Sequence, residues 1–302
     1  MRKLMMAAAV ALAALAAAPA NAKLKVFACE PEWGALVQEL GGELADIYTA
    51  TSGLQDPHQV QARPSLIAKA RAADIAVCTG AELEIAWMGL VQQQSANPKI
   101  QPGAPGYFEA TAFVRLLDKP ASFDRSQGDI HAYGNPHIQT DPRNILLVAK
   151  PLSERLATID AANAAAYRTR YADFENRWNA ALLKWQAVGA PLKGKPIAVQ
   201  HKSWVYMIGW LGLNEVVALE PKPGIPASSG YLAQVIETLK AHPAKIVIRA
   251  AYEDPRSSEF IARRMSIEPV LLPFTVGGTK EAKDLFSLYD ETLRLLSEGM
   301  GS

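Results

Sequence analysis

The 302-residue sequence has almost no net charge, and it lacks the common motifs of hydrolytic enzymes. Its 31 basic and 30 acidic side chains leave a formal charge of +1, which gives no reason to expect nucleic acid or an anionic membrane as a partner. It contains neither a His-Glu-x-x-His helix motif nor a Gly-x-Ser-x-Gly turn. These absences favour a binding protein over an enzyme.

Cysteine is also scarce, with only Cys29 and Cys78 in the chain. Each ends an apolar run that is typical of a β-strand, over residues 24–29 and 75–78. In an oxidising compartment the two would form a disulfide if these strands are neighbours, and buried free thiols are the alternative. Two cysteines without a close partner are a weak indication of a metal site or a nucleophile.

The chain begins with an apolar run that is too short and too rich in alanine for a transmembrane span. Arg2 and Lys3 precede it, and Ala20-Asn21-Ala22 follows it as a small-x-small cleavage site. We therefore expect a signal peptide over residues 1–22, cleaved after Ala22, and an exported, soluble mature chain that starts at Lys23. No cysteine follows the cut, so no lipid anchor is expected.

Strand and helix patterns alternate along the mature chain, and this alternation predicts parallel sheets with crossover helices. The patterns predict strands over 24–29, 46–50, 75–78, 113–117, 196–200, 215–219, 245–250 and 269–272. They predict helices over 32–40, 64–73, 82–93, 204–211, 228–241, 256–265 and 280–297.

Residues 160–188 lack both glycine and proline, which predicts one long amphipathic helix with Asp160 as its N-cap. Such a helix would be roughly 40 Å long at 1.5 Å per residue. Its aromatic residues recur at three- and four-residue intervals, which favours core packing. We therefore expect two Rossmann-like α/β lobes, at 23–159 and 189–302, joined by this helix at 160–188.

Histidine is rare, yet three of the five histidines occupy similar positions. His58 and His137 each follow a proline that itself follows Asp or Asn, in polar loops that lead into helix starts. His201 comes directly after an apolar, strand-like run. A single histidine in such a place is usually structural, but three of them indicate a site for a borderline metal such as Zn²⁺. Because His58 and His137 lie in the first lobe and His201 in the second, the metal would sit in the cleft between the lobes.

Several short motifs, in order and at consistent spacing, give the chain a resemblance to a known family. They are Asp56-Pro57-His58 with Pro64-Ser65, Ala73-Asp74-Ile75 with Gly80 and Glu82, Asn135-Pro136-His137 with Asp141-Pro142, and His201 with Trp204, Tyr206 and Gly209 to Leu213. Over nearly the whole mature chain, the sequence resembles the periplasmic zinc- and manganese-binding proteins of metal-uptake ABC transporters. The resemblance implies two lobes bridged by a rigid helix, His58, His137 and His201 as metal ligands, and delivery of the metal to a membrane permease. We expect a periplasmic monomer.

The resemblance fails at one position. The family usually has a carboxylate near the end of a strand in the second lobe, but here the corresponding stretch, Leu271 to Phe274, contains no acid. Water, Glu253 or Asp254 are the candidates for the fourth ligand, although both acids also suit the N-terminus of a helix at Pro255. His131, in the loop before His137, is a candidate for metal loading or a solvated loop residue, and His242 suits a helix C-terminus.

Three imidazoles favour zinc over manganese, since manganese sites depend on carboxylates. The main hypothesis is therefore capture of zinc for import. Two alternatives stay open at this point: a periplasmic zinc chaperone and, less favoured, a zinc hydrolase with an open fourth position.

Overall fold

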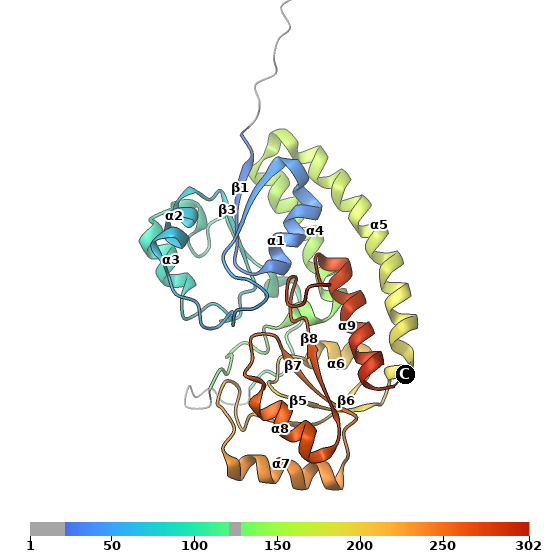
Figure 1. The fold of residues 1–302 in the computed structure, drawn as a ribbon. Helices are drawn as coiled ribbons and strands as arrows, with labels where there is room; N and C mark the ends of the chain where they lie inside the picture. Colours follow the sequence, from blue (N-terminus) through green and yellow to red (C-terminus); the bar gives the residue numbers. More distant parts are fainter. Residues whose placement is uncertain (1–21, 121–127, 302) are drawn as a thin grey trace, which may run out of the picture.

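The computed structural model describes residues 22–120 and 128–301, which form two α/β lobes flanked by one long helix (Figure 1). The predicted signal peptide falls on residues 1–22, of which 1–21 lie outside the described residues, so it stays a prediction. Among the helices of the described chain, none is both long and apolar enough to cross a membrane.

The first lobe contains a parallel four-stranded sheet in the order β2-β1-β3-β4. Its strands are β1 (Leu24–Ala28), β2 (Ala45–Thr49), β3 (Ile75–Cys78) and β4 (Tyr107–Glu109). The helices around it are α1 (Pro31–Gly41), α2 (Pro64–Ala72), α3 (Met88–Ser95) and α4 (Pro142–Ile159). The strands β1 and β3 are apolar on both faces because helices cover the sheet on both sides.

The second lobe repeats this plan with a parallel sheet in the order β6-β5-β7-β8. Its strands are β5 (Pro196–Val199), β6 (Asn214–Ala218), β7 (Ile246–Ala250) and β8 (Glu268–Leu272). Its helices are α6 (Val205–Leu211), α7 (Ser229–Ala241), α8 (Pro255–Met265) and α9 (Leu285–Gly299). The predicted fold class, two lobes with mainly parallel sheets, is therefore confirmed.

The long helix α5 (Ala164–Gly189) has 26 residues and runs along both lobes (Figure 1). It begins later than predicted, because α4 already extends to Ile159 and Asp160 ends that helix instead of starting the next. Its aromatic face is core, as expected: Tyr167, Phe174 and Trp178 are fully buried. The exact boundaries of the two lobes stay a prediction.

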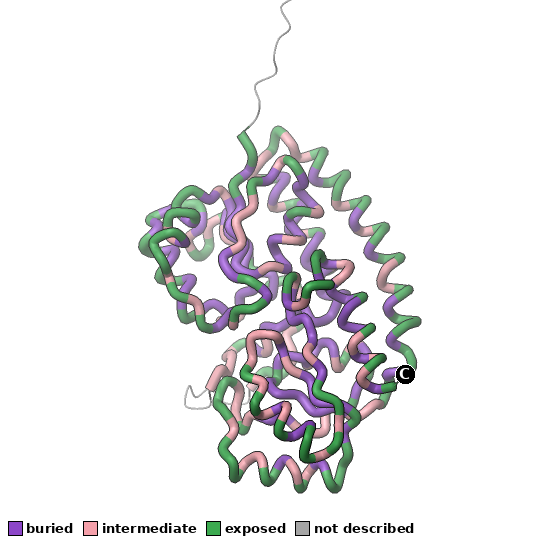
Figure 2. Tube along the Cα trace, in the orientation of Figure 1, coloured by how far each residue is buried: buried purple, intermediate pink, exposed green. Residues whose placement is uncertain are grey.

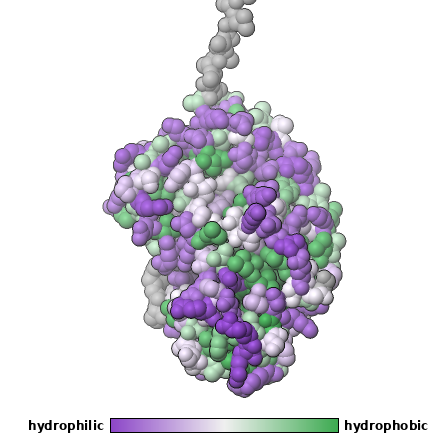
Figure 3. Space-filling view, viewed as in Figure 1, coloured by the Kyte–Doolittle hydropathy of each residue, from purple (hydrophilic) through white to green (hydrophobic). Residues whose placement is uncertain are grey.

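One apolar core continues through both lobes. Val26 and Val77 of the first sheet belong to the same cluster of buried side chains as Ile197 and Ile248 of the second, with the aromatic residues of α5 between them. Figure 2 shows this buried interior, and the face drawn in Figure 3 is largely hydrophilic with smaller hydrophobic areas. The two lobes are therefore packed together over part of their length.

Besides the long helix, three further predicted elements differ from the structure in type or extent. Residues 82–87 form turns, and α3 starts only at Met88. Glu82 has a positive φ angle that an α-helix cannot contain. The fourth strand is Tyr107–Glu109 rather than 113–117, and Gly106 allows it to form. A Cβ there would lie 2.5 Å from the carbonyl oxygen of Lys99. Finally, α9 starts at Leu285 rather than 280, with Asp284 as its N-cap.

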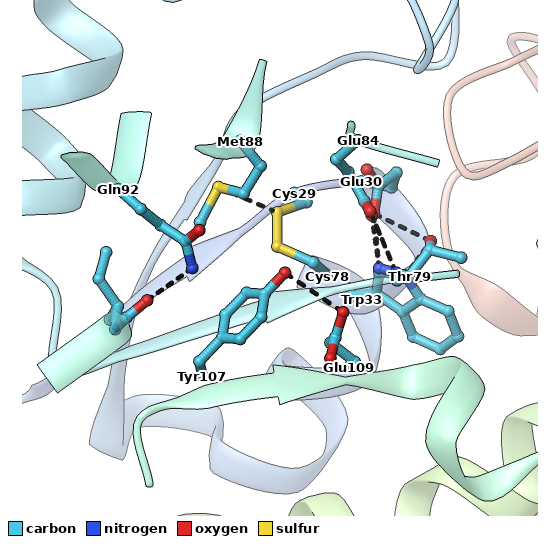
Figure 4. Close-up of a disulfide and its surroundings, with 12 residues drawn as sticks. Cys29, Glu30, Trp33, Cys78, Thr79, Glu84, Met88, Gln92, Tyr107 and Glu109 are labelled. Atoms are coloured by element: carbon cyan, nitrogen blue, oxygen red, sulfur yellow. Dashed lines mark hydrogen bonds between the residues drawn. A yellow bond between two sulfur atoms is a disulfide. The ribbon is translucent and has the colours of Figure 1, made fainter. Parts of the chain in front are cut away.

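Cys29 and Cys78 form a disulfide, so the first of the two alternatives holds. Cys29 directly follows β1, and Cys78 is the last residue of β3. Because these parallel strands are neighbours, the Cα atoms of the two cysteines are 4.8 Å apart. Figure 4 shows the bond beside Met88, Tyr107 and Glu84. Both cysteines are fully buried.

Candidate metal centre

Loops from both lobes bring His58, His137 and His201 together, as the sequence predicted. His58 lies in the loop between β2 and α2, His137 lies just before α4, and His201 follows β5. The ring centre of His137 is 5.3 Å from that of His58 and 5.9 Å from that of His201. The three residues are at most 7% exposed. Two lobes thus contribute to one buried group of imidazoles.

His131 is a fourth member of this group, and its ligand atom lies within 4.8 Å of those of His58 and His137, whereas His201 is outside this closest set. The ring centre of His131 is 5.3 Å from that of His58 and 5.9 Å from that of His137, and its Nε2 atom lies 3.3 Å from Nε2 of His58. Four nitrogens that surround zinc tetrahedrally at 2.0–2.1 Å would be separated by about 3.3 Å. From the sequence alone, His131 is a candidate for metal loading or a solvated loop residue, because distance along an irregular loop does not show where the loop folds back.

The two Asx-Pro-His segments explain how His58 and His137 are oriented. Oδ1 of Asp56 accepts hydrogen bonds from the backbone N–H of His58 at 2.9 Å and from its Nδ1 at 2.8 Å. Oδ1 of Asn135 accepts the same pair from His137, at 3.0 and 2.8 Å. The proline between them favours the turn that makes both bonds. Because an acceptor holds the proton on Nδ1, Nε2 is left as the metal-binding atom.

His201 is held in the same way from the second lobe. Its Nδ1 lies 2.7 Å from Oε2 of Glu220, which also accepts the backbone N–H of Gly224 at 2.7 Å. At the centre of the group, Nε2 of His137 is buried and has no hydrogen-bond partner within the described residues. This buried ring nitrogen lies among other imidazoles and accepts no hydrogen bond. It is therefore available as a ligand for a cation.

Burial and charge set the protonation of these rings. Burial lowers the pKa of His131 to about 3, and it lowers the pKa of His137 well below the usual value, with nearby imidazoles adding to both effects. Burial would also lower the pKa of His201, but the hydrogen bond and charge of Glu220 outweigh it and raise the pKa. Two carboxylates and one amide thus orient the rings of His58, His137 and His201. The rings of His131 and His137 stay neutral down to low pH.

A cavity of about 630 Å³ adjoins His58 and His201 and is lined by Asp56, Asp129, Glu220, Glu253 and Asp254, with Arg256 at one side. An acidic lining of this kind attracts cations.

The two acids considered as the fourth ligand have different surroundings. Asp254 is the N-cap of α8, where its side chain accepts the N–H of Arg256 and pairs with that guanidinium. The helix-start interpretation is therefore right for Asp254. Glu253 is half-buried instead: Oε2 accepts the N–H of Ala250 at 2.9 Å, and Oε1 is buried without a partner within 22–120 and 128–301. Burial raises its pKa to about 7, although the charge of His201 acts in the other direction.

Comparison with known proteins decides the family. The model of the family described as zinc-uptake complex component A, periplasmic, matches residues 26–299. The chain belongs to this ZnuA family. It is a periplasmic solute-binding component of an ABC transporter for zinc uptake, and not an enzyme. The resemblance stated from the sequence is thereby confirmed, and with it the expectations of function and of zinc as the main bound metal.

Individual relatives are distant but extend over most of the chain. The high-affinity zinc uptake system protein ZnuA of Paracoccus denitrificans is 25% identical, and the match covers 99% of this chain and 95% of that protein. The zinc-binding lipoprotein AdcA of Streptococcus pneumoniae is 22% identical over 86% of this chain and 52% of its own length. Members that bind other metals are similar too, such as the manganese ABC transporter substrate-binding lipoprotein PsaA of Streptococcus anginosus, at 19% identity over 94% of this chain and 91% of that protein.

Solved structures show the same fold. A crystal structure of ZnuA has a TM-score of 0.75 at 20% identity and covers 91% of this chain and all of that one. The protein FpvC of Pseudomonas aeruginosa, in complex with Mn²⁺, has a TM-score of 0.72 at 21% identity, with 92% and 99% covered. The arrangement of two lobes along a long helix is therefore common to ZnuA-like binding proteins.

Proposed function

We propose that the protein binds one Zn²⁺ through Nε2 atoms of His58, His131, His137 and His201 and delivers it to the permease of its uptake system. The observation that carries this is the convergence of four imidazoles, three of which have Nδ1 fixed by a polar side chain. Four neutral nitrogen ligands suit a tetrahedral zinc ion. Manganese is less favoured because it prefers oxygen ligands.

The surrounding acids support a dication at this place. Asp56 and Glu220 contact the far nitrogens of His58 and His201, so their negative charge offsets part of the charge of the metal. Glu253 lines the adjoining cavity with a carboxylate oxygen that has no partner in the described part of the chain. We assign Glu253 to this outer layer, where it compensates charge, and not to the ligand set.

Calorimetry on single alanine variants tests the ligand set. We expect a large loss of zinc affinity for His58→Ala, His137→Ala and His201→Ala. His242→Ala is the matched control, since His242 is an exposed residue at the C-terminal end of α7, and it should behave as wild type. Wild-type affinity in His201→Ala would refute a site that uses both lobes.

Zinc should also stabilise the folded protein, because the site exists only when both lobes are in place. The melting temperature should therefore rise with free zinc. Since a shared core and α5 join the lobes, we expect the radius of gyration in solution scattering to change little between apo and zinc-loaded protein. A large change would contradict this arrangement.

The processing and assembly of the protein belong to the same proposal. We propose cleavage after Ala22, a mature chain without a lipid anchor, and a monomer in solution. Mass spectrometry of protein recovered from the periplasm tests the first two, with the mass of the chain from Lys23 as the expected result. Light scattering tests the third, and a stable dimer mass would contradict it.

A further inference from the structure

We propose that Phe274 biases metal choice: its ring closes the histidine cluster with hydrocarbon on the side of His137 and keeps the oxygen-bearing groups on that side away from the metal. This inference rests on the proposed zinc site. Phe274 stands just beyond β8, at the carboxyl end of the second sheet, where parallel sheets place their binding residues. The side chain is 4% exposed.

The position of this ring is fixed by other aromatic groups. Its centre lies 5.4 Å from that of His137 in an edge-to-face arrangement. Trp204 and Tyr252 pack against it in the same way, with ring centres 5.6 and 5.5 Å away. Edge-to-face pairs at these distances are attractive, so the ring is held against a proposed metal ligand from several sides.

A small cavity with some polar groups in its lining adjoins the ring. Phe274, Gln139 and Trp204 are among the residues that line a cavity of about 10 Å³. Both polar atoms of the Gln139 side chain and Nε1 of Trp204 are buried without a hydrogen-bond partner in the described residues. A cavity of this size is about the volume that one water molecule needs.

Acidic groups lie on another side of the same ring. A second cavity of about 10 Å³ is lined by Phe274, Glu30, Glu32 and Thr275, among others. Glu32 accepts a hydrogen bond from the hydroxyl of Thr275, and both glutamates are at most 2% exposed. The ring that packs on His137 thus also lines two small cavities, and each of them has oxygen-bearing groups among its lining residues.

This position of the ring has a consequence for selectivity. Manganese prefers six ligands that are mostly oxygen, whereas zinc is satisfied by four nitrogens. While the ring of Phe274 is in place, water and carboxylate oxygens behind it cannot add to a four-nitrogen site. Without the ring, the two small cavities would join the metal site and supply oxygen ligands.

The test compares the ratio of zinc to manganese affinity in Phe274→Ala, Phe274→Leu and wild type, measured by competition with a chelator. We expect the ratio to fall at least tenfold in Phe274→Ala and to change less than threefold in Phe274→Leu, which keeps a hydrocarbon wall. Phe286→Ala is the matched control, because Phe286 packs on Trp178 of α5. Its ratio should equal that of wild type. If Phe274→Ala does not fold, Phe274→Gln serves in its place, since it keeps the length of the side chain while supplying oxygen.

Absorption of bound Co²⁺ gives an independent readout, because four-coordinate Co²⁺ absorbs visible light far more strongly than six-coordinate Co²⁺. Wild type and Phe274→Leu should give the intense spectrum, and Phe274→Ala or Phe274→Gln the weak one. An unchanged ratio together with an intense spectrum in a folded Phe274→Ala or Phe274→Gln protein would overturn the inference. Failure of the zinc site itself would show differently, as weak Co²⁺ absorption or no zinc binding in wild type.

Discussion

Replacing His131 by alanine is the most informative single change, because it separates a four-histidine site from a three-histidine site. The ring of His131 is held near the other imidazoles by its loop, which hydrogen bonds fix on either side of this residue. The N–H of Ala132 donates to Oε2 of Glu82 at 3.0 Å, and the N–H of Asp129 donates to the carbonyl oxygen of Pro223 at 2.9 Å. These bonds tie the loop to both lobes on either side of His131.

The expected magnitude follows from this preorganisation. Nε2 of His131 lies 3.3 Å from Nε2 of His58, which is about the nitrogen–nitrogen separation in a tetrahedral zinc site. Little ordering is therefore left for zinc to impose, and the variant loses the full interaction of one ligand. Loss of a residue that only supports a ligand typically costs 10- to 100-fold in metal affinity. We expect at least a 100-fold loss for His131→Ala, or about 2.8 kcal/mol at 1.4 kcal/mol per factor of ten.

The assay is competition for zinc against a chelator of known affinity, with His242→Ala as the control for removing a histidine elsewhere. Absorption of bound Co²⁺ should also change, because water would replace a nitrogen ligand. A loss of less than threefold in His131→Ala, beside large losses in the other three histidine variants, would refute the four-histidine site. His131 would then be a loading residue at most.

The remaining predictions address protonation, the disulfide and the acidic loop. Zinc affinity should fall as pH decreases through the raised pKa of His201, because bound zinc needs the neutral ring. Glu220→Gln should move this fall to lower pH, and chelator competition between about pH 5 and 8 measures both. Replacing Cys29 and Cys78 by serine should lower the free energy of unfolding by about 4 kcal/mol, since the bond closes a loop of 49 residues. Denaturant titration checks this value, and a zinc affinity more than threefold weaker would show an unexpected link to the site. Asp254→Ala should lower the free energy of unfolding through the lost cap of α8, which denaturant titration measures. A tenfold loss of zinc affinity in that variant would instead identify Asp254 as a ligand.

Much of the site was predictable because its signals are local. Asx-Pro-His specifies a turn whose first side chain binds both the backbone and the ring of the histidine, so His58 and His137 are recognisable from three residues each. His201 follows the strongly apolar strand β5, which places it at the carboxyl end of the second sheet. The family of the chain was predictable for the same reason, since the motifs that carry the resemblance are short, ordered and separated by regular elements.

The rest depends on contacts that a single sequence does not display. His131 joins the group through an irregular loop whose course is set by bonds to both lobes. The strand β4 has only three residues, and it forms because Gly106 lets the chain pass close to Lys99. Glu253 and Asp254 are adjacent, yet one turns a carboxylate oxygen inward and the other caps a helix, which hydrophobicity patterns cannot distinguish.

The continuous core has a consequence for how the molecule unfolds. Since α5 buries its aromatic side chains against elements of both lobes, the largest apolar cluster is shared, although each lobe also has a smaller cluster of its own. A fragment cut before or after this helix would expose the face that carries Phe174 and Trp178, and it would have no surface to cover it. We therefore expect a single calorimetric transition for the whole chain. Amide protons in β1 and β5 should show the same protection factor in hydrogen exchange, although their sheets lie at opposite ends of the protein.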